Sequence, residues 1–168
     1  MEEALPTPYN RIIVGSFAAM ALGVMSAAAP ALADGHGLVK YTITGAEHEY
    51  AIEKSLTGKP GDPVRGRKLS INRKKGNCLA CHAVTALKDQ PYHGEVGPSL
   101  DGVADRYKPG QLRMMIVDQK KYFPETLMPA MYKVEGLHRV VKKFQGKPIL
   151  TAQEVEDVLA FLLTLKHE

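Results

Sequence analysis

Apolar residues recur at helical spacing in three segments of the chain from Asp62 onward. In the first segment, Asp62 is a favourable N-cap residue and Pro63 suits the first helical position. The helix would continue to about Lys75, because Gly76 favours a helix end. The pattern therefore predicts a helix over residues 63–75, directly before a pair of cysteines.

A second helix is predicted from Pro109 onward. Pro109 again suits a first helical position, and Leu112, Met115 and Ile116 then fall on one helical face. An amphipathic helix with this spacing buries its apolar face against the rest of the domain.

The third helix has the clearest start signal. Thr151 and Glu154 form a capping box, in which each side chain can satisfy a backbone N–H group near the other. The apolar positions that follow keep helical spacing to about Lys166. These positions are Val155, Val158, Leu159 and Leu162.

The remaining segments carry loop signals. Residues 83–108 and 121–150 are rich in proline and glycine. Residues 34–62 lack helical periodicity, although residues 38–44 are typical of a short strand. We therefore expect an extended N-terminal arm at residues 34–62 and a folded domain at residues 63–168. The arm would lie on the domain or on a partner.

The first 33 residues are typical of an export signal. Arg11 precedes an apolar run from Ile12 to Met25, and Ala31-Leu32-Ala33 matches a signal peptidase site. A retained membrane anchor is the alternative, because the apolar stretch has marginal spanning length. The cleavage pattern favours a cleaved signal peptide at residues 1–33, and hence a periplasmic protein with no stable membrane anchor.

Composition and charge limit the function classes. The chain is 45% apolar and 24% charged, which suits one soluble globular domain. Removing Glu2, Glu3 and Arg11 with the leader raises the net charge from +4 to +5. This modest positive charge favours acidic protein partners and does not indicate nucleic-acid binding.

The only two cysteines of the chain lie in Cys78-Leu79-Ala80-Cys81-His82. A disulfide within this pentapeptide would close a tiny loop and stabilise little. C-x-x-C-H is the attachment sequence for haem c. The two thiols add across the haem vinyl groups, and His82 then lies where its imidazole can bind the iron. The sequence therefore predicts one covalently bound haem c, attached through Cys78 and Cys81.

Three other interpretations of this motif are less favoured. A thioredoxin-like redox pair needs a surrounding βαβ pattern, which the sequence lacks. A zinc site needs further ligands, but the other histidines are scattered along the chain. A chance match is disfavoured by the export signal. Those histidines are His36, His48, His93, His138 and His167.

A methionine downstream is the expected second axial ligand, because a thioether favours electron transfer over oxygen chemistry. Met114 and Met115 fall in the second predicted helix. Met128 precedes Pro129 in an irregular segment that can bend over the haem, so it is favoured over Met131. A five-coordinate or histidine-ligated iron remains the alternative.

Two further features have both a structural and a functional interpretation. In Gly97-Pro98-Ser99-Leu100, the carbonyl of Pro98 can accept a hydrogen bond from Nδ1–H of His82 and orient the ring. An ordinary Gly-Pro turn explains the same residues. The basic residues between Arg65 and Lys75 form either a solvated helix face or a positive ring that guides an acidic redox partner.

Taken together, Cys78–His82, Gly97–Leu100, Met128-Pro129 and the last helix resemble class I cytochrome c over residues 63–168. Within that family, the chain resembles the SoxX-type subunits of the SoxAX sulfur-oxidation complex. Residues 96–103, 126–130 and 146–162, together with the arm, carry this narrower resemblance. It implies an all-α class I cytochrome c fold, with three to five helices around one haem.

The resemblance also implies partners. SoxX-type subunits pair with a SoxA haem subunit, and the complex joins thiosulfate oxidatively to a cysteine of the SoxYZ carrier. The implied activity is that of an L-cysteine S-thiosulfotransferase complex. This chain would be its electron-transfer subunit and would have no catalytic residue of its own. It would pass electrons to a downstream redox acceptor. The alternatives are a free-standing monohaem electron shuttle and a haem enzyme or gas sensor with an open iron site.

Overall fold

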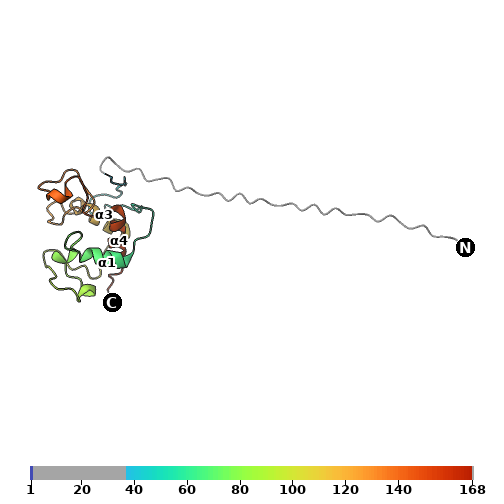
Figure 1. Cartoon of the computed structure of the whole chain (residues 1–168), viewed down its shortest axis with the longest axis horizontal. Helices are drawn as coiled ribbons and strands as arrows, with labels where there is room; N and C mark the ends of the chain where they lie inside the picture. The colour runs from blue at the N-terminus through green and yellow to red at the C-terminus, as the bar shows by residue number, and fades with distance from the viewer. Residues whose placement is uncertain (2–36, 168) are drawn as a thin grey trace.

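The computed structural model describes Met1 and residues 37–167 (Figure 1). Apart from Met1, the predicted signal peptide lies outside the described residues. The described part is helical and contains no strand, although Thr44 and Ala51 form an isolated antiparallel bridge. Its α-helices are α1 Pro63–Ser70, α2 Val103–Arg106, α3 Pro109–Asp118 and α4 Ala152–Leu162. Its 3-10 helices are η1 Cys78–Ala80, η2 Thr85–Leu87, η3 Gln119–Lys121 and η4 Lys142–Phe144.

Helix α1 begins as predicted but is shorter. The Asp62 side chain accepts hydrogen bonds from the backbone N–H groups of Val64 and Arg65, and Pro63 is the first helical residue. The prediction that the helix continues to Lys75 was wrong, because α1 ends at Ser70. The chain then folds back on the helix end. A Cβ on Gly76 would lie 2.6 Å from the carbonyl oxygen of Leu69, so this return is too close for a side chain.

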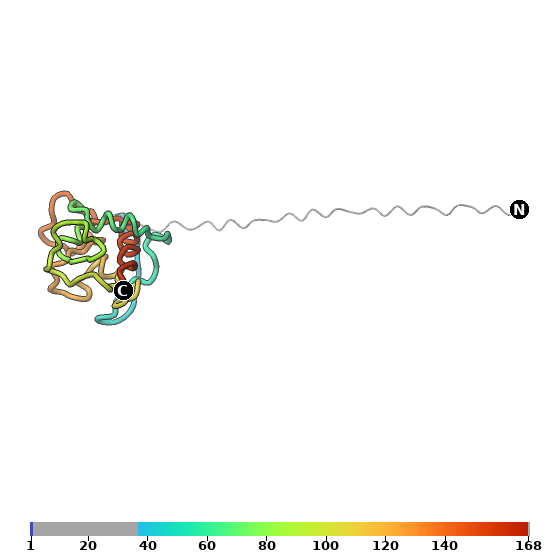
Figure 2. The backbone as a smooth tube through the Cα atoms, turned by 90° about the horizontal axis from the view of Figure 1, so that it is seen from below, coloured from blue at the N-terminus to red at the C-terminus, as the bar shows by residue number. Residues whose placement is uncertain are grey.

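Helices α1 and α4 cross in close contact (Figures 1 and 2). Gly66 of α1 permits the approach. A Cβ at this position would lie 2.8 Å from the Cβ of Phe161 and even closer to the carbonyl oxygen of Asp157. At the start of α1, the Asp157 carboxylate accepts a hydrogen bond from the Asp62 N–H at 2.9 Å and also binds Arg65. The crossing is therefore stabilised by close backbone packing and by the hydrogen bonds that the Asp157 carboxylate accepts from α1 and its N-cap.

Helix α3 is buried on more than one face. The predicted stripe of Leu112, Met115 and Ile116 is buried, but Met114 and Val117 are fully buried as well. This helix therefore lies inside the domain, not on its surface. The described core also includes Val155, Val158, Leu159, Phe161 and Leu162 of α4.

Helix α4 begins at the predicted capping box. The Thr151 hydroxyl accepts from the Glu154 N–H, and the Glu154 carboxylate accepts from the Thr151 N–H. The helix ends at Leu162, four residues before the predicted end at Lys166. The chain turns there because the carbonyl of Leu165 accepts a hydrogen bond from the Ala104 N–H at 3.1 Å, which joins the C-terminus to α2.

Residues 37–62 lie against α3 and α4. The predicted strand at residues 38–44 does not form in this segment. Instead, Ile52 and Leu56 are buried, with exposed fractions of 1% and 3%. The Leu56 N–H donates to the Glu156 carboxylate at 2.8 Å, and the Arg113 guanidinium donates to the Ile52 carbonyl at 2.6 Å.

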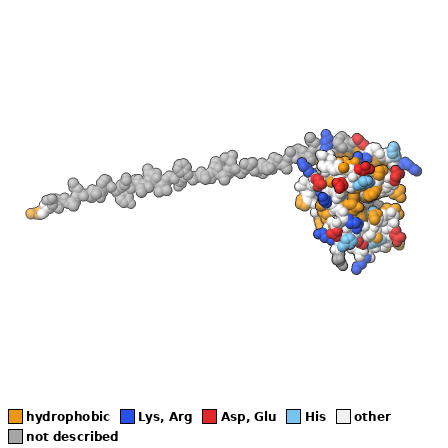
Figure 3. All heavy atoms as spheres, turned by 180° about the vertical axis from the view of Figure 1, so that it is seen from behind, with side chains coloured by type: hydrophobic (Ala, Val, Ile, Leu, Met, Phe, Trp, Pro, Cys, Tyr) orange, Lys and Arg blue, Asp and Glu red, His pale blue; other side chains and the backbone are white. Residues whose placement is uncertain are grey.

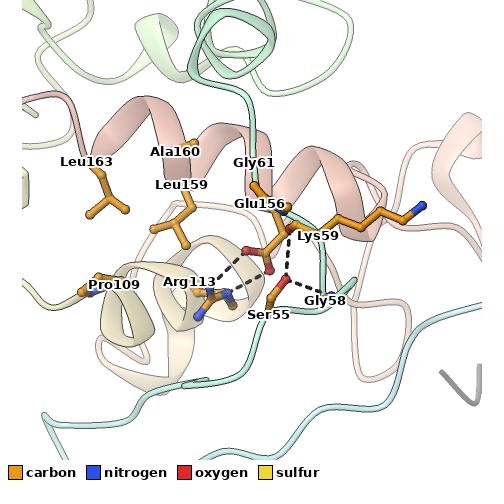
Figure 4. A pocket seen from close by; sticks show the side chains of 11 residues that line it. Ser55, Gly58, Lys59, Gly61, Pro109, Arg113, Glu156, Leu159, Ala160 and Leu163 are labelled. Carbon is orange, nitrogen blue, oxygen red and sulfur yellow. Dashed lines mark hydrogen bonds and ion pairs between the residues drawn. The ribbon is translucent and has the colours of Figure 1, made fainter. Parts of the chain in front are cut away.

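Arg113 and Glu156 also form a two-point ion pair with each other, at 2.9 and 3.0 Å (Figure 4). Both side chains are nearly buried, at 9% and 4% exposed. Breaking such a pair leaves a buried charge without its partner, which typically costs about 3–5 kcal/mol. The pair thus fastens the N-terminal segment to both long helices.

The loop-rich segments lie on one side of the crossed helices (Figures 1 and 2). Residues 121–150 contain Met128, and residues 83–108 directly follow the turn with Cys78, Cys81 and His82. Within the described residues, no helix has the length and apolar character needed to cross a membrane.

Candidate haem site

The C-x-x-C-H segment folds as a tight 3-10 turn. The carbonyl of Cys78 accepts hydrogen bonds from the N–H groups of Cys81 and His82, at 3.1 and 3.0 Å. Asn77 precedes the turn in the left-handed region, with φ of 50°. The turn thus holds the three predicted haem-binding residues within one compact backbone unit.

The chain after the motif returns alongside it. The Gly94 N–H donates to the carbonyl of Leu79 at 2.8 Å, and the Gly97 N–H donates to the carbonyl of Cys81 at 2.7 Å. One step further, the Leu100 N–H donates to the carbonyl of Ala83. These bonds set residues 97–98 directly beside the His82 ring.

The His82 ring is held from two sides. Its Nδ1 lies 2.6 Å from the carbonyl oxygen of Pro98, the contact expected from the sequence. A Cβ on Gly97 would lie 2.7 Å from Nδ1 and 2.9 Å from Nε2, so the bare Cα of Gly97 packs on the ring. With Nδ1–H donated to Pro98, the Nε2 lone pair is available for a metal ion.

Cys78 and Cys81 are not joined by a disulfide, and each is partly exposed. Burial of the thiol raises the pKa of Cys78, against the weaker opposing effect of the Ser70 hydroxyl. A redox-active C-x-x-C pair needs the opposite shift, because its nucleophile is a thiolate. The raised pKa of Cys78 therefore disfavours a thioredoxin-like role.

Among the other described histidines, His93 is the nearest to this motif in the sequence. Both of its ring nitrogens already have hydrogen-bond partners, so it does not compete with His82 as a ligand. Nδ1 accepts from the Val84 N–H at 3.2 Å, and Nε2 lies 3.1 Å from the carbonyl of Leu87. Within residues 37–167, no group of three or more His, Cys, Asp or Glu side chains could hold a metal ion.

The methionines have different environments. Met114 and Met131 are buried core residues, at 0% and 7% exposed. Met115, which follows Met114 on α3, is buried as well. Met128 is only partly buried and packs at the edge of the core. Its neighbour Leu127 is 84% exposed. Met128 therefore remains the best candidate for the sixth ligand.

These residues fit a covalently bound haem. The free thiols of Cys78 and Cys81 would supply the attachment points, and the oriented imidazole of His82 would supply an axial ligand. When bound, haem provides a one-electron redox centre whose potential depends on its axial ligands and their hydrogen bonds. Met128 is the residue that would complete the coordination.

Comparison with known proteins agrees with this chemistry. A family model described as Cytochrome c matches residues 63–166. The chain belongs to the cytochrome c family. It is also 44% identical to a chain in the crystal structure of SoxXA from P. pantotrophus, with a TM-score of 0.67. That match covers 74% of this chain and 95% of the other. A search of curated proteins found no match.

The protein is thus a SoxX-like class I cytochrome c with a covalently bound haem c. The all-α fold expected from the sequence is confirmed. The roles of His82, Met128 and Pro98 stay predictions.

Three of the six basic residues between Arg65 and Lys75 form ion pairs. Arg65 binds Asp62 and Asp157, Arg67 binds Asp89, and Lys75 binds Glu154. On the face drawn in Figure 3, basic side chains lie dispersed among acidic and apolar ones. These contacts favour a structural, solvated helix face over a continuous positive ring.

The tight packing of Gly97 on His82 and the two hydrogen bonds of the His93 ring were not predicted from the sequence. A glycine before proline signals a turn, but it does not reveal which side chain its Cα will touch. His93 gives no local signal, since its two hydrogen bonds depend on the return of the loop to Val84 and Leu87.

Proposed function

We propose that this cytochrome is the electron-transfer subunit of a SoxAX-like heterodimer that oxidises thiosulfate. The observation that carries the proposal is the 44% identity to a chain of SoxXA, with 95% of that chain covered. The partner would be a SoxA-like haem subunit, and the complex would act on a SoxYZ-like sulfur carrier. The site would lie in the periplasm, after removal of residues 1–33.

In this proposal, His82 and Met128 are the axial ligands of a six-coordinate iron. Two strong-field protein ligands leave no open position for a substrate, which suits electron transfer. The His82–Pro98 hydrogen bond keeps the imidazole in one orientation in both oxidation states. The site would therefore exchange electrons without binding the sulfur compound.

The cysteine count supports a division of labour between two chains. Joining thiosulfate to a carrier cysteine forms one S–S bond and releases two electrons and the thiol proton. A thiolate on the enzyme would help to hold the sulfur compound, but this chain has only Cys78 and Cys81. Both are consumed by haem attachment. The sulfur chemistry would thus take place on the partner, and this haem would take up the electrons one at a time.

Exposed apolar side chains beside the ligand residues support docking near the haem edge. Val96 is 68% exposed and precedes Gly97, which touches His82. Leu127 is 84% exposed and precedes Met128. The N-terminal segment contributes less than the sequence implied, because Ile52 and Leu56 are already buried in their own domain.

Purification from the native periplasm tests the proposal. We expect the mature protein to co-purify with a second haem subunit, and we expect its haem to be reduced when thiosulfate and the carrier protein are added. A Leu127→Ser variant should weaken the association and leave the haem spectrum unchanged. A stable monomer with no second haem subunit, reduced equally well without thiosulfate, would instead identify an independent electron shuttle.

A further inference from the structure

The loop that carries Met128 is closed at its base by the end of α3. The Met131 N–H donates to the carbonyl of Ile116 at 3.2 Å, and the Tyr132 N–H donates to the carbonyl of Val117 at 3.3 Å. These bonds bring the chain back against the helix from which the loop departs. Residues 119–130 therefore form a compact closed loop, with Met128 near its returning end.

An ion pair with a buried carboxylate spans the same base. The Nζ atom of Lys133 donates to Oδ2 of Asp118 at 2.7 Å. The Asp118 side chain is only 6% exposed, whereas the Lys133 side chain is 34% exposed. Hydrogen bonds between charged groups are stronger than neutral ones, and removing one partner leaves the buried charge unsatisfied. The pair thus opposes separation of the two ends of the loop.

Lys120 makes a second connection inside the loop. Its Nζ atom donates to the carbonyls of Pro124 and Thr126, at 3.2 and 2.8 Å. The Thr126 hydroxyl in turn accepts from the Met128 N–H at 3.2 Å. One ammonium group on η3 therefore binds two carbonyls of the segment that leads to Met128, two and four residues before it.

We propose that Asp118, Lys120 and Lys133 are positioning residues that keep the Met128 loop closed and so set how often Met128 leaves the iron. This inference rests on the proposed ligation by His82 and Met128. Loops open locally at a lower free-energy cost than the whole domain unfolds. Each charged contact that must break on opening adds to that cost, so its removal raises the population of the open loop.

Carbon monoxide binding to the reduced holoprotein measures this opening. At saturating carbon monoxide, the binding rate is limited by departure of the methionine. We expect Lys120→Met and Lys133→Met each to raise the limiting rate roughly tenfold, which corresponds to about 1.4 kcal/mol. Far-UV circular dichroism in urea should show a much smaller change in global unfolding.

Lys121→Met is the matched control. Lys121 is the exposed neighbour of Lys120, and its side chain makes no hydrogen bond or ion pair with residues 37–167. This variant removes the same charge and should bind carbon monoxide at the parental rate. An equal rate increase in Lys121→Met would show a general charge effect and overturn the inference. Unchanged rates in Lys120→Met and Lys133→Met would also overturn it.

The parental protein separates this inference from the proposed ligation. A thioether-to-iron charge-transfer band in the ferric protein supports Met128 as a ligand, and the variants then test the positioning residues alone. Absence of that band, with immediate carbon monoxide binding by the parental protein, would overturn both the ligation and the positioning roles.

Discussion

The packing of Gly97 on His82 makes Gly97→Ala a sensitive test of the candidate site. The added Cβ would lie 2.7 Å from Nδ1 and 2.9 Å from Nε2 of the imidazole. Ordinary contact begins near 3.4 Å, so the ring or the loop must move by roughly 0.5–1 Å. That movement strains the packing and weakens the Nδ1 hydrogen bond to Pro98, which is 2.6 Å long.

The cost can be worked out from these two effects. Overpacking a tight site typically costs about 1–3 kcal/mol. Loss of one hydrogen bond adds about 0.5–1.5 kcal/mol. We therefore expect Gly97→Ala to lower the free energy of unfolding by about 2–4 kcal/mol, or to lower the melting temperature by roughly 10 °C.

The assay is urea unfolding of the holoprotein, followed by far-UV circular dichroism, together with measurement of the reduction potential. A weaker bond from Nδ1–H makes the imidazole less basic and stabilises ferric iron less, so the potential should rise. Val96→Ala is the matched control, because Val96 is the exposed neighbour and should change neither quantity appreciably. Unchanged stability and potential in Gly97→Ala would refute the argument that Gly97 and Pro98 orient His82.

Three other predictions concern the ligand, the acid stability and the helix crossing. Met128→Ala should abolish the thioether-to-iron charge-transfer band and allow immediate carbon monoxide binding; a retained band would exclude Met128 as the ligand. The Arg65 hydrogen bond lowers the pKa of the Asp157 carboxyl, so the folded state resists protonation. The resulting stabilisation is present above the usual carboxyl pKa of about 3.9 and is lost as the pH falls through the lower folded-state pKa. Asp157→Asn should thus flatten the acid side of the stability profile, as measured by urea titrations at several pH values, and an unchanged slope would contradict this. Gly66→Ala should destabilise the domain by about 2 kcal/mol or more in urea unfolding, because its Cβ has no space against α4, and parental stability would show that the crossing is looser.

Much of the site could be predicted from the sequence, because the residues involved lie within a few positions of one another. Haem attachment requires two thiols and an imidazole at fixed spacing, so Cys78, Cys81 and His82 can be recognised without a structure. Helix starts are also local, because a cap and its backbone donors lie within a few residues. Asp62 and Thr151 accordingly occupy the predicted positions, and both cap the helices expected of them.

Helix ends and the paths of the loops depended on contacts between residues far apart in the chain. Helix α1 stops at Ser70, where the chain folds back and Gly76 meets Leu69. The N-terminal segment looked like an arm because its apolar residues have no helical period. It is fastened by Arg113 and Glu156, two charged residues whose pairing across α3 and α4 has no sequence signature.

The sequence by itself determined which cofactor this chain can bind. The five consecutive residues Cys78–His82 contain all the groups that covalent haem attachment requires. Only the tertiary structure decided how the proposed axial ligands are held. The carbonyl of Pro98 reaches His82 from 16 positions away, and Lys133 reaches Asp118 from 15 positions away. Such contacts form only when the folded chain returns on itself, so no local pattern of residues can encode them.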